Sequence, residues 1–255
     1  MVLAWIGALL IGITLGLLGS GGSILTVPVL TYLVGQETKV AIAGSLMIVG
    51  IISLFAMVPY AQQKLVNWRT VVVFGVPGML GAGAGAGAAH FVSDAVQMLV
   101  FAALLLIASY LMFKPVKLQE PSDEIAERAM VKIAIDGFLV GAITGLVGVG
   151  GGFLIIPALV LLGGLSMRLA VGTSLVIIAI KSFAGFIGYL SVLEALELSI
   201  DWTIIGIFSV IGVLGSWLGH KLSSKVNQEH LKQGFAVFLI LMGVFILYES
   251  LMDVL

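Results

Sequence analysis

The chain is a succession of apolar runs separated by short polar or glycine-rich breaks. Several runs reach the roughly 20 residues that an α-helix needs to cross the hydrocarbon core of a bilayer. Segments of about ten residues with alternating polarity, the pattern of a membrane β-barrel, do not occur. The pattern therefore predicts an all-α polytopic membrane protein. The expected apolar pieces are 2–18, 23–34, 40–60, 71–89 and 95–113, then 133–147, 153–162, 169–190, 202–219 and 231–247.

The ten pieces form two sets of five, which indicates an internal duplication. Asn67 and Trp68 in the first set correspond to Asp201 and Trp202 in the second. Because each copy is long, the repeat is half of a membrane bundle rather than a solenoid unit. We expect a first repeat over 1–113, a polar cytoplasmic linker over 114–131 and a second repeat over 132–255. At a shift of 129 positions, Gly16, Gly19, Gly21, Gly22 and Pro28 match Gly145, Gly148, Gly150, Gly151 and Pro157.

Basic residues predict the orientation, because loops rich in Lys and Arg stay on the cytoplasmic side. Lys64 and Arg69 place one loop in the cytoplasm, and the basic residues of the linker do the same there. The repeat partner of the Lys64 loop holds Glu197 and Asp201 without a basic residue, which predicts an external loop. The two repeats are therefore expected to be inverted. Each would have about three full spans plus a glycine-broken helix pair that enters and returns, and an arrangement of four plus four parallel spans is the alternative.

The repeated glycine clusters are the first candidate binding site. Glycine weakens a helix, and broken backbone inside a bilayer is tolerated only where protein covers it or where it lines a watery cavity. A half-helix that starts after such a break points free N–H groups at the site, and these attract anions. The alternative is that the glycines only permit close helix packing. The candidate substrate-binding residues here are Gly19, Gly21, Gly22, Ser23, Gly148, Gly150, Gly151 and Gly152.

A lysine inside an apolar run is the second candidate. Lys181 lies within 169–190, far from either end, and a charge at mid-helix costs roughly 2.5–3.5 kcal/mol on the permissive insertion scale. We expect it to hold an anion beside the half-helix termini, and the alternative is a lysine that extends to the interface. Thr173, Ser174 and Ser45, the repeat partner of Ser174, could add hydroxyl groups, or could bond only their own helices.

Composition narrows the class of protein. Apolar residues make up 60% of the chain and charged residues 10%, which excludes an ordinary soluble domain. The net charge of −1 gives no reason to expect nucleic acid as a partner. The chain has no cysteine and its three histidines are scattered, so we expect neither a metal site nor a cofactor. Asp136 could carry a coupled proton, although its nearness to Lys132 favours a solvated helix end.

The two motifs GLLGSGGSILTVPVL and GLVGVGGGFLIIPALVLLGGLSMRLAVGTSL resemble the TauE/SafE family of sulfite-exporter-like permeases. The resemblance covers nearly the whole chain, with Ser23 where the second copy has Gly152 as a small departure. It implies a multi-pass protein of a prokaryotic plasma membrane that moves a small anion such as sulfite or an organosulfonate. The absence of cysteine argues against a cysteine-dependent thiosulfate carrier.

These observations lead us to expect a secondary transporter with alternating access, whose anion binds near the midplane between the two breaks. Its partners would be the anion, the lipid bilayer and a coupled proton or ion. No nucleotide-binding GxxxxGK motif occurs, so the energy would come from a gradient or a separate subunit. An anion channel on the same site is the main alternative. An enzyme is not expected, because neither a nucleophile–base pair nor an HExxH motif is present, and an assembly factor would have a larger extramembrane domain.

Overall fold

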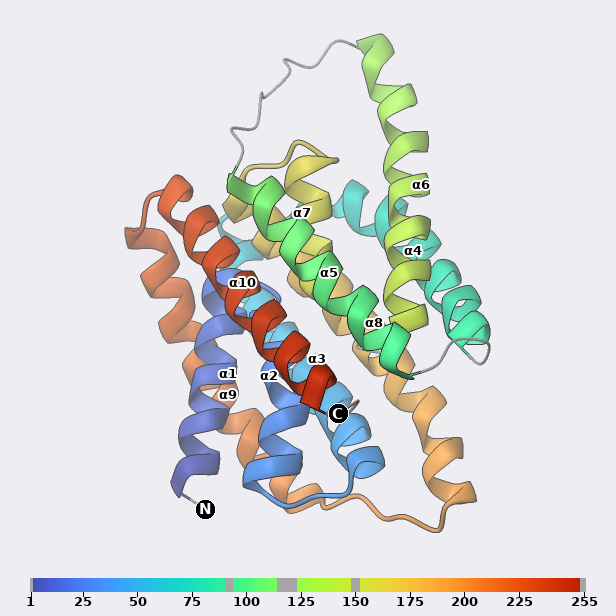
Figure 1. The fold of residues 1–255 in the computed structure, drawn as a ribbon. Helices are drawn as coiled ribbons and strands as arrows, with labels where there is room; N and C mark the ends of the chain where they lie inside the picture. Colours follow the sequence, from blue (N-terminus) through green and yellow to red (C-terminus); the bar gives the residue numbers. More distant parts are fainter. Residues whose placement is uncertain (1, 90–93, 114–122, 148–151, 253–255) are drawn as a thin grey trace. The chain divides into compact units, whose positions relative to one another are not determined.

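The computed structural model describes residues 2–89, 94–113, 123–147 and 152–252, and in these residues the chain is helical without a strand. The prediction of an all-α protein is therefore confirmed. Helix α6 begins at Asp123, inside the polar stretch expected as a linker. The elements are α1 (Val2–Leu18), α2 (Gly21–Pro28), the π-helical turn η1 (Val29–Leu33), α3 (Thr38–Gln62), α4 (Trp68–Ala89), α5 (Asp94–Phe113), α6 (Asp123–Val147), α7 (Gly152–Leu161), α8 (Met167–Ala195), α9 (Trp202–Lys225) and α10 (Gln228–Met252) (Figure 1).

Among the described residues, four helices are long and apolar enough to cross a membrane by themselves. They cover Lys39–Gln62, Met167–Ala195, Trp202–Lys225 and Glu229–Tyr248. Shorter apolar helices cover Leu3–Leu18, Gly22–Leu33 and Ala102–Phe113. Large apolar side chains on several helices are exposed, including Leu214 and Trp217 on α9 and Leu241 on α10. Such surfaces suit contact with lipid, so the chain has the build of a multi-pass membrane protein.

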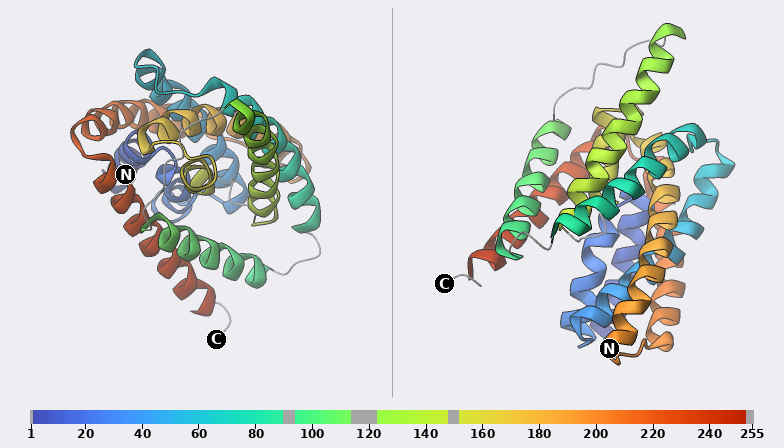
Figure 2. Two further views of the ribbon diagram at one scale, coloured as in Figure 1. Left: turned by 90° about the horizontal axis from the view of Figure 1, so that it is seen from above. Right: turned by 90° about the vertical axis from the view of Figure 1, so that its right-hand side faces the viewer.

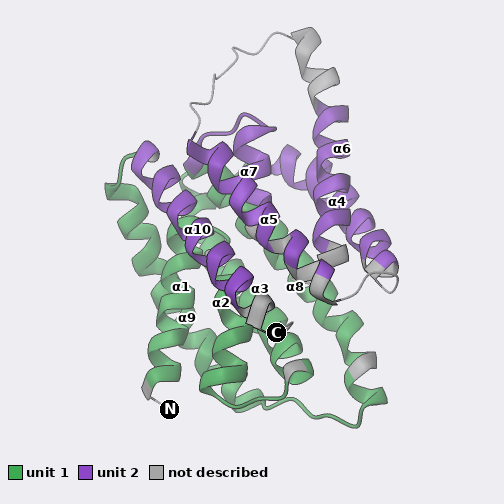
Figure 3. Ribbon diagram, in the orientation of Figure 1, with its two compact units in different colours: residues 1–67, 168–227 green, residues 68–167, 228–255 purple. Residues whose placement is uncertain are grey.

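The helices form two compact units, and each unit combines segments from both halves of the chain. Unit 1 contains 1–67 and 168–227, and unit 2 contains 68–167 and 228–255 (Figure 3). Unit 1 thus holds α1, α2, η1 and α3 together with α8 and α9. Unit 2 holds α4 and α5 together with α6, α7 and α10. The first and second halves of the sequence are therefore interleaved rather than packed as two separate bodies.

In unit 1, α1 runs parallel to α9 at very short range. A Cβ atom on Gly12 would collide with the backbone of Gly212, and one on Gly16 would collide with the backbone of Ser216. A step of four residues along α1 corresponds to a step of four residues in the same direction along α9, so the two helices are parallel. Small residues at these positions allow the backbones to touch, as in other membrane helix pairs.

Helix α8 crosses α3 in the opposite direction within unit 1. Gly172 near the start of α8 meets Leu65, just beyond the end of α3. Later in α8, the Phe183 ring lies against Gly50, which is near the middle of α3. The two helices are therefore antiparallel. They are also the helices that correspond to one another in the two predicted repeats.

Segment α2–η1 folds back along α1. Gly22 packs against Ile11 and Leu15, whereas Val29 packs against Gly7, so the two segments are antiparallel. Pro28 lacks an N–H group and the chain continues from it as a π-helical turn, closed by the Val34 amide bonding to the Val29 carbonyl at 3.2 Å. The result is a hairpin of two short helices with the glycine break at its tip.

Unit 2 repeats the same packing with other residues. Helix α4 runs parallel to α6, and a Cβ atom on Gly141 would collide with the backbone of Gly78. These two glycines are the repeat partners of Gly12 and Gly212. Helices α5 and α10 lie side by side in Figure 2 and are antiparallel: the Ser109 hydroxyl donates to the Ala236 carbonyl at 2.9 Å, and Leu106 packs on Gly243.

Candidate functional site

The first glycine break lies between α1 and α2 in unit 1. Gly19 has φ +76°, a conformation that glycine adopts without steric cost, and it turns the chain through the tip of the hairpin. Its amide still bonds to the Leu15 carbonyl at 2.8 Å, which closes the last turn of α1. Ser20 is then the N-cap residue of α2. The break predicted from the glycine cluster is present at this position.

The carbonyl groups at the end of α1 are covered by side chains from other helices of unit 1. The last four carbonyls of a helix have no partner within it. Here the Tyr60 hydroxyl on α3 donates to the Gly16 carbonyl at 2.7 Å. The Ser174 hydroxyl on α8 donates to the Gly19 carbonyl at 3.3 Å and to the Val171 carbonyl at 2.8 Å. The acceptor groups of the break are thus engaged by the protein itself.

The start of α2 is different, because donor groups collect there. Ser20 is fully buried, its hydroxyl has no hydrogen-bond partner in the described residues, and it does not cap the first-turn amides. The Ser23 hydroxyl donates to the Ser20 carbonyl at 2.8 Å, and the Thr26 hydroxyl donates to the Gly22 carbonyl at 2.7 Å. A helix N-terminus with a buried, unpaired hydroxyl favours a negatively charged ligand.

The break lies nearer one end of unit 1 than its middle. The parallel register of α1 and α9 sets Leu18, the last residue of α1, close to the Gly219 turn of α9. That turn lies roughly 5–10 Å beyond the midpoint of α9 at 1.5 Å per residue, toward Lys221 and Lys225. Within unit 1 the break therefore lies beyond the midpoint of α9, on the side of Lys221 and Lys225.

Lys181 lies at the level where α8 crosses the middle of α3, two residues before Phe183. Its side chain is half-buried, and no ion pair with it is found in the part of the chain that the structure describes. It follows Ser174 by two helical turns, so the two residues share one face of α8. Side chains on a helix lean toward its N-terminus, and in α8 that is the direction in which Ser174 meets the Gly19 carbonyl.

The other residues predicted for the binding site lie at several places in the structure. Thr173 is engaged in the fold, since its hydroxyl donates to the Leu169 carbonyl at 2.6 Å and accepts from the Asn67 amide at 3.0 Å. Ser45 is buried on α3. Gly21 and Gly22 begin α2. In the second break, Gly148, Gly150 and Gly151 lie outside the described residues, and Gly152 begins α7 in unit 2.

Tyr60 is a site residue that the sequence analysis missed. It is buried, and its ring lies edge-on to the His220 ring with centroids 4.4 Å apart. A usable signal was present, because a tyrosine near the end of an apolar helix usually finds a hydrogen-bond partner when it is buried.

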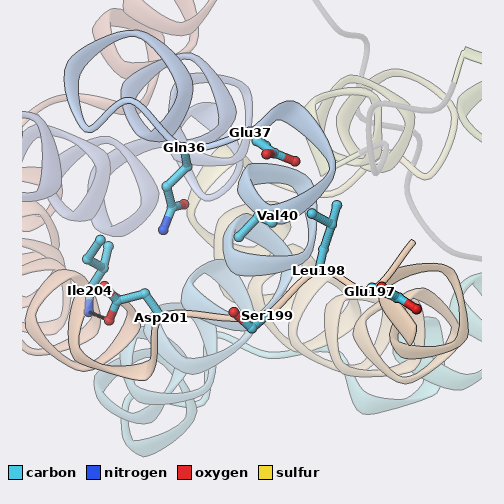
Figure 4. Close-up of a pocket in the computed structure, with 8 residues that line it drawn as sticks. All are labelled: Gln36, Glu37, Val40, Glu197, Leu198, Ser199, Asp201 and Ile204. Carbon is cyan, nitrogen blue, oxygen red and sulfur yellow. Dashed lines mark hydrogen bonds between the residues drawn. The ribbon is translucent and has the colours of Figure 1, made fainter. Parts of the chain in front are cut away.

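A cavity of about 330 Å³ opens at the opposite end of unit 1 (Figure 4). Asp201 caps α9 there by accepting from the Thr203 amide at 2.9 Å and the Ile204 amide at 3.2 Å. Three carboxylates on the wall disfavour an anion, and no group of three ligands that could hold a metal is found among the described residues. The lining residues are Gln36, Glu37, Val40, Glu197, Leu198, Ser199, Asp201 and Ile204.

Comparison with known proteins identifies what the chain is similar to. Residues 4–246 match the family model described as sulfite exporter TauE/SafE. A probable membrane transporter protein of Xylella fastidiosa is 32% identical over 248 residues, which cover 94% of this chain and 92% of the relative. A probable membrane transporter protein of Methanocaldococcus jannaschii is 28% identical over 94% of each chain. The probable membrane transporter protein YunE of Bacillus subtilis is 29% identical over 95% of this chain and 96% of its own length.

Proposed function

Because the chain belongs to the sulfite exporter TauE/SafE family, we propose that it is a secondary transporter, a permease that moves sulfite or an organosulfonate across the prokaryotic plasma membrane by alternating access. Its full-length relatives carry the names of membrane transporters, which supports a transport role over an enzymatic one. The substrate class is argued from the first break and Lys181.

The observation that carries the anion assignment is the half-buried Lys181 without an acidic partner among the described residues. A cation in the middle of a membrane helix is normally paired with a carboxylate or with a ligand. Lys181 lies on the face of α8 that leads to Ser174 and the break, where Ser20 adds an unpaired hydroxyl. An anion held between Lys181 and the start of α2 would satisfy all of these groups.

We also propose that the two repeats are inverted. Helices α3 and α8 are repeat partners, and so are α5 and α10. Both pairs are antiparallel within their own units, which is the relationship that a two-fold axis in the membrane plane produces. Inverted repeats offer a route to alternating access, because exchanging the conformations of the two halves exposes a site to the other side of the membrane.

If the first break moves during the transport cycle, its hydrogen bonds to Tyr60 and Ser174 must break. Both bonds join the hairpin α1–α2 to the crossing helices α3 and α8. The hairpin and the crossed pair are therefore proposed as the moving elements of unit 1. A coupled proton or ion would supply the energy.

The test is anion flux into proteoliposomes that contain the purified full-length chain. Sulfite, sulfate, sulfoacetate, taurine and acetate are offered in turn to the wild type and to Lys181→Met. The substitution keeps an unbranched apolar side chain of similar length and removes the ammonium group with its charge. We expect saturable flux for one sulfur anion and at least a tenfold loss in the variant, because a charge-assisted hydrogen bond contributes roughly 1.5–3 kcal/mol.

Lys221→Met is the matched control, because Lys221 is exposed near the end of α9. It removes the same charge away from the proposed site and should leave flux unchanged. Equal flux in wild type and Lys181→Met would exclude Lys181 from the site. Flux that never saturates, at a rate far above that of a carrier, would favour a channel.

A further inference from the structure

A second group of polar side chains, two of them buried and one half-buried, lies in unit 1 at the end that carries the lysines of α9. Arg168 is the second residue of α8, and His220 and Ser223 lie in the last two turns of α9. His220 is only 8% exposed and Ser223 only 1%. The Arg168 Nη2 atom donates to the carbonyls of Ser223 at 3.3 Å and Val226 at 3.0 Å, so the start of α8 is fixed to the end of α9.

Three polar atoms of this group have no hydrogen-bond partner in the described residues. They are Nε of Arg168, Nδ1 of His220 and Oγ of Ser223. Leaving one buried polar group unpaired costs about 1–3 kcal/mol, so three unpaired groups close together call for a ligand that satisfies them. The carbonyl acceptors satisfy Nη2 of Arg168, whereas the neighbouring Nε–H on the same edge of the guanidinium has no acceptor in the described residues.

All three atoms are hydrogen-bond donors. The guanidinium Nε–H can only donate, and a serine hydroxyl can donate. The Gln63 amide nitrogen lies 3.0 Å from His220 Nε2, so Gln63 donates to Nε2 and the imidazole proton resides on Nδ1. This tautomer follows from the assigned orientation of the Gln63 amide. It makes Nδ1 a third donor.

The charge of the surroundings agrees with a negatively charged ligand. Arg168 is close enough to Tyr60 and His220 for its positive charge to act on both. The sequence of unit 1 contains four acidic residues, Glu37, Glu194, Glu197 and Asp201, and all of them lie at the opposite ends of α3, α8 and α9. These four carboxylates are therefore too remote to pair with Arg168, and the acidic residue nearest in sequence to its acceptor Val226 is Glu229 of unit 2.

We propose that Arg168, His220 and Ser223 form a second anion-binding site in unit 1, separate from the one at Lys181 and the break. The ligand is a small oxyanion of the sulfate type, which accepts several hydrogen bonds at once and matches one guanidinium, one imidazole and one hydroxyl donor. The repeat partners of Arg168 and His220 are Lys39 and Ala86, so the site belongs to one half of the chain only.

Tyr60 connects this second site to the first break. Its ring lies against His220 on one side, and its hydroxyl donates to the Gly16 carbonyl on the other. The Ser223 hydroxyl lies near the Tyr60 hydroxyl. An anion that draws Ser223 and His220 toward Arg168 therefore acts on the residue that holds the end of α1.

The test is binding of inorganic sulfate to the full-length chain in lipid nanodiscs, measured by calorimetry and by the sulfate-dependent rise in Tm. The key variants are His220→Ala and Arg168→Gln, and Arg168→Lys keeps the charge. Lys221→Gln is the control for Arg168→Gln, since it removes one exposed charge beside His220. All variants are also made in a Lys181→Met background, so that only the second site can respond.

We expect the Lys181→Met protein to retain saturable sulfate binding, and His220→Ala and Arg168→Gln to weaken it at least tenfold while Lys221→Gln leaves it unchanged. Partial recovery of sulfate affinity in Arg168→Lys would show that the positive charge at this position contributes to binding. Sulfate binding that is insensitive to His220→Ala and Arg168→Gln, or absent in Lys181→Met, would overturn the second site and would mean that the three donors are hydrated by water. Neither result depends on flux, so the transport proposal is judged separately.

Discussion

Gly12 and Gly212 touch through their backbones, because a methyl group on Gly12 would occupy the space of the Gly212 carbonyl. Gly141 and Gly78 stand in the same relationship in unit 2, at the positions that the internal duplication assigns to them. The two compact units are thus built on one helix contact used twice. The contact joins α1 to α9 in unit 1, and it joins α6 to α4 in unit 2.

This contact predicts a loss of stability on enlargement. Gly12→Leu should destabilise the protein by about 1–3 kcal/mol or more, because α1 and α9 must separate to admit the side chain. Gly206→Ala is the matched control on α9, where nothing lies within 4 Å of the added Cβ. It should be neutral or stabilising by up to about 1 kcal/mol, since alanine favours the helix. Thermal unfolding in detergent compares the two, and equal Tm values would contradict the contact.

Removal of the Tyr60 hydroxyl should weaken the end of α1. Tyr60→Phe leaves the Gly16 carbonyl without its donor, at a cost of about 1–3 kcal/mol for a buried group. The proposed transport cycle depends on how α1 ends, so maximal flux should fall as well. Tyr189→Phe is the control, because Tyr189 packs against the apolar cluster of Val40, Ala43 and Leu193. A Tyr60→Phe protein with normal Tm and flux would remove Tyr60 from this role.

Ser20→Ala should separate binding from stability. The Ser20 hydroxyl is buried and unpaired among the described residues, so its loss should leave the Tm unchanged or raise it slightly. The same change should raise the KM for the transported anion severalfold if the hydroxyl contributes to the site. In Ser23→Ala the lost hydroxyl bonds only the Ser20 carbonyl, and KM should stay constant. An unchanged KM in both variants would place the anion elsewhere.

Asp201→Ala should destabilise α9 alone. The carboxylate of Asp201 accepts from the amides of Thr203 and Ile204, and removal of such an N-cap costs about 0.5–2 kcal/mol. Asp201→Asn keeps a capping oxygen and should recover most of the loss. Tm measurements on both variants test the cap. Anion KM should not respond, since Asp201 precedes the first turn of α9 and the first break lies near the Gly219 turn, toward the other end of that helix.

The sequence predicted features that depend on local composition. The helical fold follows from runs of apolar residues, and the break at Gly19 follows from several glycines ahead of a proline. Lys181 was recognised because a charge stands out in an apolar run. The break between α1 and α2 could thus be predicted before any tertiary contact was known.

Other features depend on contacts between distant segments, which periodicity does not encode. The bond from Tyr60 to Gly16 joins different helices, and the group of Arg168 and His220 forms only because the start of α8 meets the end of α9. The three histidines looked scattered in the chain, so His220 was not considered as part of a site. The displacement of the break from the middle of α9 likewise comes from the register of α1 on α9.

The interleaving of the two halves also sets the order in which the molecule can be assembled. Helix α1 is synthesised well before its packing partner α9, which begins only at Trp202. Until that segment has entered the bilayer, the glycine face of α1 has no α9 backbone to meet, and unit 1 cannot close. Contacts between segments this far apart in the sequence form late, so unit 1 closes only after α9 has been inserted.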